Sequence, residues 1–194
     1  MDLQLEDKTA LVTGSNRGTG EIIARTLAVE GVKVLVHSNE PELAREVAET
    51  IDNAGAVYGD VSTQAGCDSV LEQVIELTGG VDILVNNYGT ADRGTWDSAA
   101  TEQWLESYQR NVLSAARLSQ GLMPIMRDRG WGRIIQLGTI GSHQPNAIMP
   151  HYYAAKGALA TMGVSLAREL SGTGVTVNTV APGLIHTAEL ETAY

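Results

Sequence analysis

The stretch TALVTGSNRGTGEIIARTLAVEG, residues 9–31, decides the fold expected for this chain. Its first residues, 9–13, form a short apolar run typical of a buried strand. The glycine-rich segment TGSNRGTG at 13–20 follows, and the helical pattern of 21–31 ends at a glycine that can cap the helix. A strand, a glycine-rich turn and a helix in this order predict an anion site, because the free N–H groups at the helix N-terminus point toward the turn.

The rest of the chain repeats this alternation of short apolar runs and longer amphipathic segments. Strands are predicted at 32–37, 56–61, 81–87, 132–139 and 175–180, and helices at 41–55, 66–77, 101–127 and 152–170. Pro124 is expected to break or kink the helix at 101–127 near its end. Six strands separated by helices predict an α/β fold, a doubly wound parallel sheet with helices on both faces. In such sheets the ligand binds at the carboxyl ends of the strands.

The composition fits a single domain that spans residues 1–194. Hydrophobic residues make up 43% and charged residues 19%, values typical of a globular protein. The formal net charge of -10 disfavours binding to nucleic-acid backbones or anionic membrane surfaces. No apolar run approaches the roughly 20 residues of a membrane span, the single Cys67 cannot form an internal disulfide, and the N-terminus lacks a signal-peptide pattern. These features predict a cytoplasmic protein that binds neither nucleic acid nor membrane.

The segment HYYAAKGA at 151–158 contains two adjacent tyrosines shortly before a lysine. On a helix, residues three and four positions apart share a face, so Tyr152 and Tyr153 can each approach Lys156. A tyrosine with the ordinary pKa of about 10 is a weak acid near neutrality, and a neighbouring ammonium group stabilises its phenolate. Helix geometry alone does not choose between the two tyrosines, and an amphipathic helix with two surface aromatics fits the same pattern.

Six landmarks in a fixed order resemble the short-chain dehydrogenase/reductase family, in particular members like the 3-oxoacyl-carrier-protein reductases. The landmarks are Gly-x-x-x-Gly-x-Gly at 14–20, Asp60-Val61, Asn86-Asn87-Tyr88-Gly89, Asn111, Tyr-x-x-x-Lys at 152–156 and Pro182-Gly183. The resemblance implies a Rossmann-type sheet of about six strands in the order 3-2-1-4-5-6. It also implies hydride transfer between a nicotinamide cofactor and a small-molecule carbonyl or secondary alcohol, in a homodimer or homotetramer. The substrate-covering C-terminal segment of the family is absent from these 194 residues.

The resemblance further implies a set of catalytic residues: Asn111, Thr139, Tyr152 and Lys156. The family pattern Tyr-x-x-x-Lys selects Tyr152 as the general acid/base, with Lys156 holding the cofactor ribose and tuning the tyrosine. A hydroxyl residue 13 positions before Tyr152 falls on Thr139, which would stabilise the substrate oxygen. The family usually has serine there, and threonine keeps the hydroxyl but adds a methyl group that restricts its rotamer. Asn111 would hold a water molecule of a proton relay.

The end of the second strand bears on the choice of cofactor. NAD-selective sites place a carboxylate there, but the segment VHSN at 36–39 has none, and the family's Asp position falls on Ser38. Arg17 occupies a place where NADP-dependent members carry a basic residue, and a guanidinium suits a phosphate dianion. The expected cofactor is therefore NADP(H), with NAD(H) as the alternative. The cofactor-binding residues implied are Gly14, Ser15, Asn16, Arg17, Gly18, Gly20, Ser38, Asn39, Asp60, Val61, Asn87, Gly89, Tyr152, Lys156, Pro182, Gly183, Ile185 and Thr187.

Two other functions are compatible with the same sequence. One is an NAD-dependent alcohol or sugar dehydrogenase, and the other is a non-catalytic dinucleotide-binding or assembly protein of the same fold. Tyr88 stands where the family usually has alanine, and its ring would either line the substrate cleft or pack harmlessly. His143, His151 and His186 show no metal-ligand spacing, so no metal site is expected.

Overall fold

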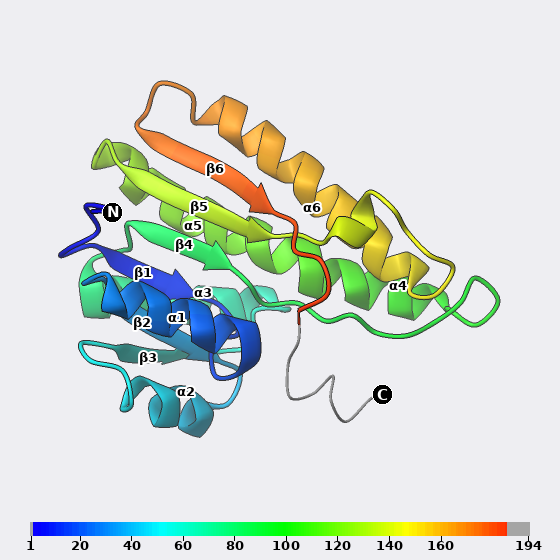
Figure 1. Ribbon diagram of the computed structural model, residues 1–194, viewed down its shortest axis with the longest axis horizontal. Helices are drawn as coiled ribbons and strands as arrows, with labels where there is room; N and C mark the ends of the chain where they lie inside the picture. Colours follow the sequence, from blue (N-terminus) through cyan, green and yellow to red (C-terminus); the bar gives the residue numbers. More distant parts are fainter. Residues whose placement is uncertain (1, 186–194) are drawn as a thin grey trace.

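Six strands form one parallel sheet in the order β3-β2-β1-β4-β5-β6, as Figure 1 shows for the computed structural model of the protein, which describes residues 2–185. The strands are β1 (Thr9–Val12), β2 (Lys33–Ser38), β3 (Gly55–Tyr58), β4 (Ile83–Asn86), β5 (Gly132–Leu137) and β6 (Val175–Val180). The register places Val12 of β1 between Val36 of β2 and Val85 of β4, so the central strands end at the same edge. The predicted fold class and strand order are confirmed.

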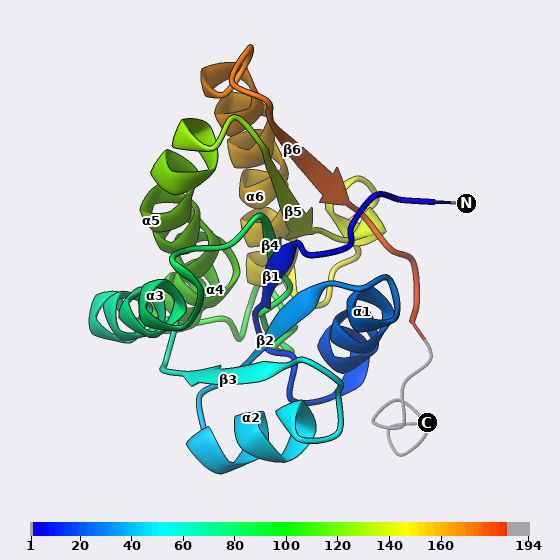
Figure 2. The same cartoon turned by 90° about the vertical axis from the view of Figure 1, so that its left-hand side faces the viewer.

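Helices cover both faces of the sheet, with α1 and α2 on one side and α3, α5 and α6 on the other (Figure 2). The helices are α1 (Gly18–Val29), α2 (Pro41–Ala48), α3 (Gln64–Thr78), α4 (Thr101–Tyr108), a π-helical turn (Gln109–Leu113), α5 (Ser114–Asp128), a 3-10 turn (Ile140–Ser142) and α6 (Pro150–Glu169). On one face, Val12 shares an apolar cluster with Ala24 of α1. On the other, Leu11 shares a cluster with Leu122 of α5. Burial on both faces explains why the central strands β1 and β4 are mostly aliphatic.

The helical stretch predicted at 101–127 is confirmed, since the chain is helical from Thr101 to Asp128, but the expected break at Pro124 is wrong. The interruption comes earlier, at the π-helical turn between α4 and α5, which carries Asn111 to the buried side. Pro124 lies inside α5 without ending it. The carbonyl that the proline leaves without an intrahelical donor belongs to Gln120, an exposed residue where water can satisfy it.

The helix predicted at 41–55 is also too long, because α2 ends at Ala48. Asn53 has a positive φ of 56°, a left-handed conformation that no right-handed helix can contain. The other predicted elements agree with the structure to within a few residues. No helix within residues 2–185 is long and apolar enough to cross a membrane.

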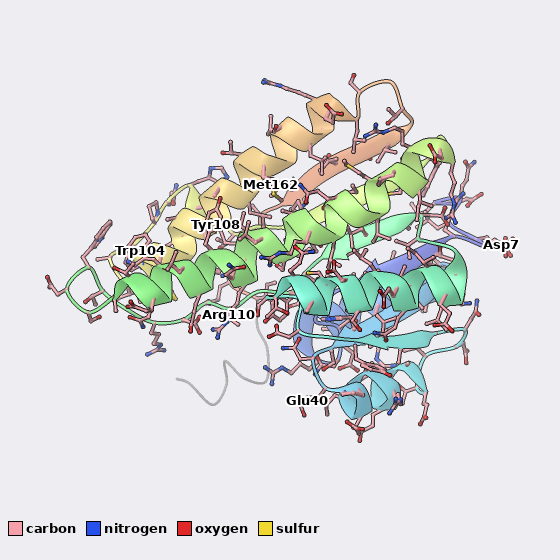
Figure 3. All side chains as sticks on the ribbon, turned by 180° about the vertical axis from the view of Figure 1, so that it is seen from behind. Asp7, Glu40, Trp104, Tyr108, Arg110 and Met162 are labelled. Carbon is pink, nitrogen blue, oxygen red and sulfur yellow. The ribbon has the colours of Figure 1, made fainter. Side chains whose placement is uncertain are left out.

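The outer surface of α4 and α6 is partly apolar (Figure 3). Figure 3 labels Trp104 and Tyr108 on α4 and Met162 on α6. Leu105 and Val164 are exposed on the same pair of helices. The expected homodimer or homotetramer stays a prediction.

Candidate active site

The glycine-rich turn after β1 is shaped by close backbone contacts. Gly14 and Gly18 have positive φ values of 62° and 56°, which glycine adopts without strain. A Cβ on Gly20 would collide with the carbonyl of Gly14 and the side-chain amide of Asn87. Asn87 donates from Nδ2 to the carbonyls of Thr13 and Gly14 at 2.8 and 3.1 Å. The turn is therefore held from β4 as well as from its own ends, and α1 begins directly after it.

His37, which the sequence interpretation passed over, fixes the turn from the other side. Its fully buried ring accepts the Gly14 N–H at Nδ1 and donates from Nε2 to the Gly59 carbonyl, both at 3.0 Å. Because the Gly59 carbonyl can only accept, the neutral Nε2–H tautomer fits both bonds. Burial lowers the pKa of His37 to about 4, against smaller raising effects of the Gly59 hydrogen bond and of Asp60. The only sequence signal was an imidazole in a strand of valine and leucine.

Protonation of His37 should destabilise the fold in mild acid. The unfolded state takes up this proton near pH 6.5 and the folded state only near pH 4, so stability falls as the pH drops through that window. The full shift corresponds to about 3 kcal/mol of unfolding free energy. Urea unfolding between pH 4 and 7 should show this loss in the parent chain and not in His37→Leu, which is less stable throughout. His143→Leu, at an exposed position, should keep the parent slope. An unchanged slope in His37→Leu would refute the assignment.

A cavity of about 260 Å³, called the catalytic cavity below, opens at the carboxyl ends of β4, β5 and β6. Its walls include five residues expected from the sequence to act in binding or catalysis: Asn87, Gly89 and Thr139, which follow β4 and β5, and Tyr152 and Lys156 of α6. Pro182, Gly183 and Ile185, which follow β6, close another side. Thr187 lies outside the described residues. The structure thus brings the expected catalytic hydroxyl groups and the lysine into one cavity.

Lys156 is almost fully buried in this cavity, with 4% of its surface exposed. Its Nζ donates to the carbonyl of Leu137 at 2.7 Å and lies 5.9 Å from the centroid of the Tyr152 ring. Within residues 2–185 no carboxylate forms an ion pair with it. Burial lowers the pKa of Lys156 to about 8, because the charged form loses hydration.

The two tyrosines have different environments. Tyr152 contacts Thr139, and Tyr153 accepts a hydrogen bond from Asn146 Nδ2 at 3.1 Å. The Tyr153 ring packs so tightly on Gly141 that a Cβ there would collide with it. Tyr152 therefore belongs to the cavity, and Tyr153 supports its wall.

The pKa of Tyr152 is raised and not lowered, which differs from the tuning by lysine expected from the sequence. Burial is the largest cause, the neighbouring Tyr153 adds to it, and the hydrogen bond with Thr139 opposes both. The ammonium of Lys156 is already engaged by the Leu137 carbonyl. Tyr152 in this structure is therefore a protonated phenol at neutral pH.

Thr139 caps the short 3-10 turn that follows β5. Its Oγ1 accepts from the Gly141 N–H at 3.2 Å, which leaves the hydroxyl proton able to point into the cavity. The nearby Ser142 donates its own hydroxyl to the Thr139 carbonyl at 2.8 Å. Of these two hydroxyl groups only that of Thr139 lines the cavity.

Asn111 approaches the cavity from the π-helical turn. Its Nδ2 donates to the carbonyls of Thr90 and Ser107, each at 3.0 Å, while its buried Oδ1 has no hydrogen-bond partner among residues 2–185. A Cβ on Gly89 would collide with this Oδ1 and would lie 3.2 Å from Lys156 Nζ. Glycine at position 89 therefore keeps open a small space between the amide oxygen and the ammonium.

A cavity of about 240 Å³ lies between the glycine-rich turn and the end of β2, and it shares three wall residues with the catalytic cavity: Asn87, Gly89 and Thr90. Gly14, Asn16, Arg17, Ser38 and Asn39 are the expected cofactor residues that line only this second space. Tyr88 also lines it and does not line the catalytic cavity.

Some expected binding residues line neither cavity; these are Ser15, Gly18, Gly20, Asp60 and Val61. The carboxylate of Asp60 instead accepts from the N–H and hydroxyl of Ser62 at 3.0 and 2.6 Å, and the Val61 side chain belongs to the core. No group of three or more His, Cys, Asp or Glu side chains that could hold a metal ion occurs in the part of the chain that the structure describes.

A parallel sheet with a glycine-rich turn and a Tyr–Lys pair at its carboxyl edge defines the class of dinucleotide-binding α/β oxidoreductases. The sequence profile of the short chain dehydrogenase family matches residues 8–193, and the chain belongs to this family. It is accordingly an NAD(P)-dependent oxidoreductase that acts on CH–OH or C=O groups.

Named relatives agree with this assignment. The 3-oxoacyl-[acyl-carrier-protein] reductase of Escherichia coli (strain K12) is 38% identical over 186 residues, which cover 95% of this chain and 76% of the relative. The crystal structure of L-sorbose reductase from Gluconobacter frateurii, complexed with NADPH and L-sorbose, matches with a TM-score of 0.96 and 37% identity, over 100% of this chain and 76% of that one. A gluconate 5-dehydrogenase from Burkholderia cenocepacia J2315, in complex with NADP and tartrate, matches with a TM-score of 0.90 and 29% identity, over 97% and 75% of the two chains.

Proposed function

We propose that the protein is an NADPH-dependent carbonyl reductase in which Tyr152 donates the proton. The observation that carries this proposal is the placement of Tyr152, Thr139 and Lys156 in one cavity at the carboxyl edge of the sheet. Reduction of a carbonyl requires a hydride for the carbon and a proton for the oxygen. Bound NADPH supplies the hydride, and the side chains of this cavity supply the proton and stabilise the oxygen.

Tyr152 and Thr139 act on the substrate oxygen. Because burial raises the pKa of Tyr152, its hydroxyl holds a proton near neutral pH and can transfer it as negative charge develops on that oxygen. The hydroxyl of Thr139 can donate a hydrogen bond to the same atom, since its own oxygen is oriented by the Gly141 N–H. Two donors on one side of the oxygen favour the alkoxide-like transition state over the ground state.

Lys156 and Asn111 restore the proton. With a pKa lowered to about 8, Lys156 is still largely an ammonium at neutral pH and stabilises the phenolate that remains on Tyr152. The partnerless Oδ1 of Asn111 lies beside the same Gly89. An acceptor in that place can hold a water molecule that returns a proton to the lysine.

The residues present fit a dinucleotide. The two cavities adjoin through Asn87, Gly89 and Thr90, which gives one continuous path from the end of β2 to Tyr152. Gly20 and Gly89 have no room for a Cβ beside this path, and the N-terminus of α1 offers free N–H groups to phosphates. Arg17, Ser38 and Asn39 would hold the adenosine phosphate, while Lys156 would hold the ribose next to the nicotinamide.

The preference for NADPH over NADH rests on Arg17, Ser38 and Asn39, which line the cavity beside the glycine-rich turn, where an NAD-selective site would carry a carboxylate. The relatives crystallised with NADPH and NADP support this reading. Glu40 also lines the cavity, but it lies one residue beyond this set.

Arg17→Ala should weaken NADPH binding by about 10- to 100-fold, the range expected for the loss of one charge-assisted contact. NADH binding should change by no more than about twofold, since NADH lacks the 2′-phosphate. Fluorescence titration with both cofactors measures the two dissociation constants. Arg127→Ala, at the end of α5, provides the control and should change neither. Equal losses for NADPH and NADH in Arg17→Ala would favour the NAD-dependent alternative.

The substrate is proposed only as a small carbonyl compound. The names of the relatives point to substrates as different as 3-oxoacyl-[acyl-carrier-protein] and L-sorbose. NADPH oxidation by the 194-residue chain with β-keto esters, ketoses and aldehydes tests the proposal. NADPH binding without turnover of any of these compounds would favour a non-catalytic dinucleotide-binding protein.

A further inference from the structure

Tyr88 occupies an unusual place in the cofactor cavity. It follows β4 directly and lines the cavity between the glycine-rich turn and the end of β2, together with Gly14, Arg17 and Asn39. Most of the other side chains that line this space are polar or absent, and the Tyr88 ring is its one aromatic carbocycle within residues 2–185. A planar apolar surface is therefore presented at a fixed point of an otherwise polar cavity.

The Tyr88 ring is held at both ends. Its backbone N–H donates to Thr13 Oγ1 at 2.9 Å, and a Cβ added to Gly14 would lie only 3.3 Å from its Cα, so the base of the side chain is pressed against β1. Burial raises the pKa of its hydroxyl most, while hydrogen bonds with the side chains of Asn39 and Ser62 lower it. Those two residues follow β2 and β3, so the Tyr88 side chain extends from the end of β4 toward the carboxyl ends of β2 and β3.

The orientation of the ring is set by His37. The two rings meet edge to face, with centroids 6.4 Å apart and an interplanar angle of 88°. His37 cannot turn away, because both of its ring nitrogens are hydrogen bonded. The Tyr88 ring also packs against the apolar cluster that contains Leu11 and Leu122, so it loses less rotational freedom when a ligand stacks on it, which favours stacking.

We propose that Tyr88 is the residue on which the adenine ring of the cofactor stacks, and that it thereby sets the affinity for the adenosine half. This inference rests on the proposed NADPH-dependent function. With the adenosine phosphate at Arg17, Ser38 and Asn39, the attached base lies in the cavity that Tyr88 lines. Stacking on an aromatic side chain is available to the flat base and not to the phosphates or the nicotinamide ribose.

Binding of three probes to the full chain tests the role of Tyr88: NADPH, 2′,5′-ADP, and reduced nicotinamide mononucleotide, which lacks the adenosine half. Tyr88→Ala should weaken the binding of NADPH and of 2′,5′-ADP by the same factor, about tenfold or more, which is the range of base–aromatic stacking. Reduced nicotinamide mononucleotide should bind as it does to the parent chain. Tyr88→Phe keeps the ring, and its affinity for NADPH and 2′,5′-ADP should fall by about threefold or less. Tyr88→Leu keeps most of the bulk without the ring and should bind both probes as weakly as Tyr88→Ala does.

The outcomes separate this inference from the function on which it rests. Parent-like or tighter binding of 2′,5′-ADP by Tyr88→Ala would overturn the stacking role and would mean that the ring obstructs the base. If Tyr88→Ala does not fold, parent-like binding by Tyr88→Leu would overturn it equally. Failure of the parent chain to bind both NADPH and 2′,5′-ADP would instead overturn the proposed function.

Discussion

Tyr152→Phe should lower kcat for NADPH-dependent carbonyl reduction by about a thousandfold, within the range that general acid catalysis contributes. The substitution removes one oxygen and leaves the ring in place, so the packing against Tyr153, with ring centroids 5.5 Å apart, should survive. The proton that the raised pKa keeps on Tyr152 is then missing from the cavity. The dissociation constant of NADPH should stay within about twofold of the parent value, because Lys156 still holds its position through the Leu137 carbonyl.

Tyr153→Phe is the matched control for this experiment. Its hydroxyl accepts a hydrogen bond from the exposed Asn146, and the ring supports the wall around Gly141. We expect kcat within a few-fold of the parent enzyme. Steady-state assays with a substrate found in the carbonyl panel measure both variants. Loss of turnover in Tyr153→Phe with retention in Tyr152→Phe would reverse the assignment of the proton donor, and retention in both would remove tyrosine from the chemistry.

The parallel sheet could be predicted from local patterns because the strands are short segments rich in aliphatic residues and are separated by turn residues and amphipathic helices. Leu11 and Val12 show the limit of such reasoning: both are buried, yet they belong to apolar clusters on opposite faces of the sheet. The run of apolar residues indicates burial without telling which helices provide it. The proximity of Lys156 to both tyrosines could be predicted because helix geometry keeps residues three and four apart on one face, whereas the choice of Tyr152 came from the family pattern.

The features that escaped prediction depend on contacts between distant segments. The role of His37 arises only when the ends of β1, β2 and β3 lie side by side, which allows one ring to bond Gly14 and Gly59. Tyr88 could not be placed on the cofactor side for the same reason. The π-helical turn at Gln109–Leu113 adds one residue to a helical repeat without any glycine or proline to mark it. Its effect on Asn111 is visible only in three dimensions.

The burial of Lys156 has a cost in stability that follows from its place in the site. Burial lowers the pKa of Lys156 from 10.5 to about 8. The charged lysine therefore lowers the unfolding free energy by about 3 kcal/mol at neutral pH. The unfolded state keeps its proton up to about pH 10.5, so this cost is complete below pH 8 and is relieved as the pH rises toward 10.5. The single hydrogen bond to Leu137 offsets the cost only in part.

Lys156→Met should therefore stabilise the fold while abolishing most of the activity. Removing the buried charge should raise the unfolding free energy by about 3 kcal/mol. The Leu137 carbonyl, left without a donor, should lower it by about 1–2 kcal/mol, so the net increase at pH 7 should be about 1–2 kcal/mol. The gain should shrink above pH 8, whereas kcat should fall by about a thousandfold or more because phenolate stabilisation is lost. Urea unfolding at pH 7 and 9.5 measures the first effect, and Lys33→Met, at the start of β2, should show no such pH dependence. A less stable Lys156→Met at pH 7 would mean that the lysine holds the fold together, whereas a more stable and inactive variant would mark it as a charge retained for chemistry at the expense of stability.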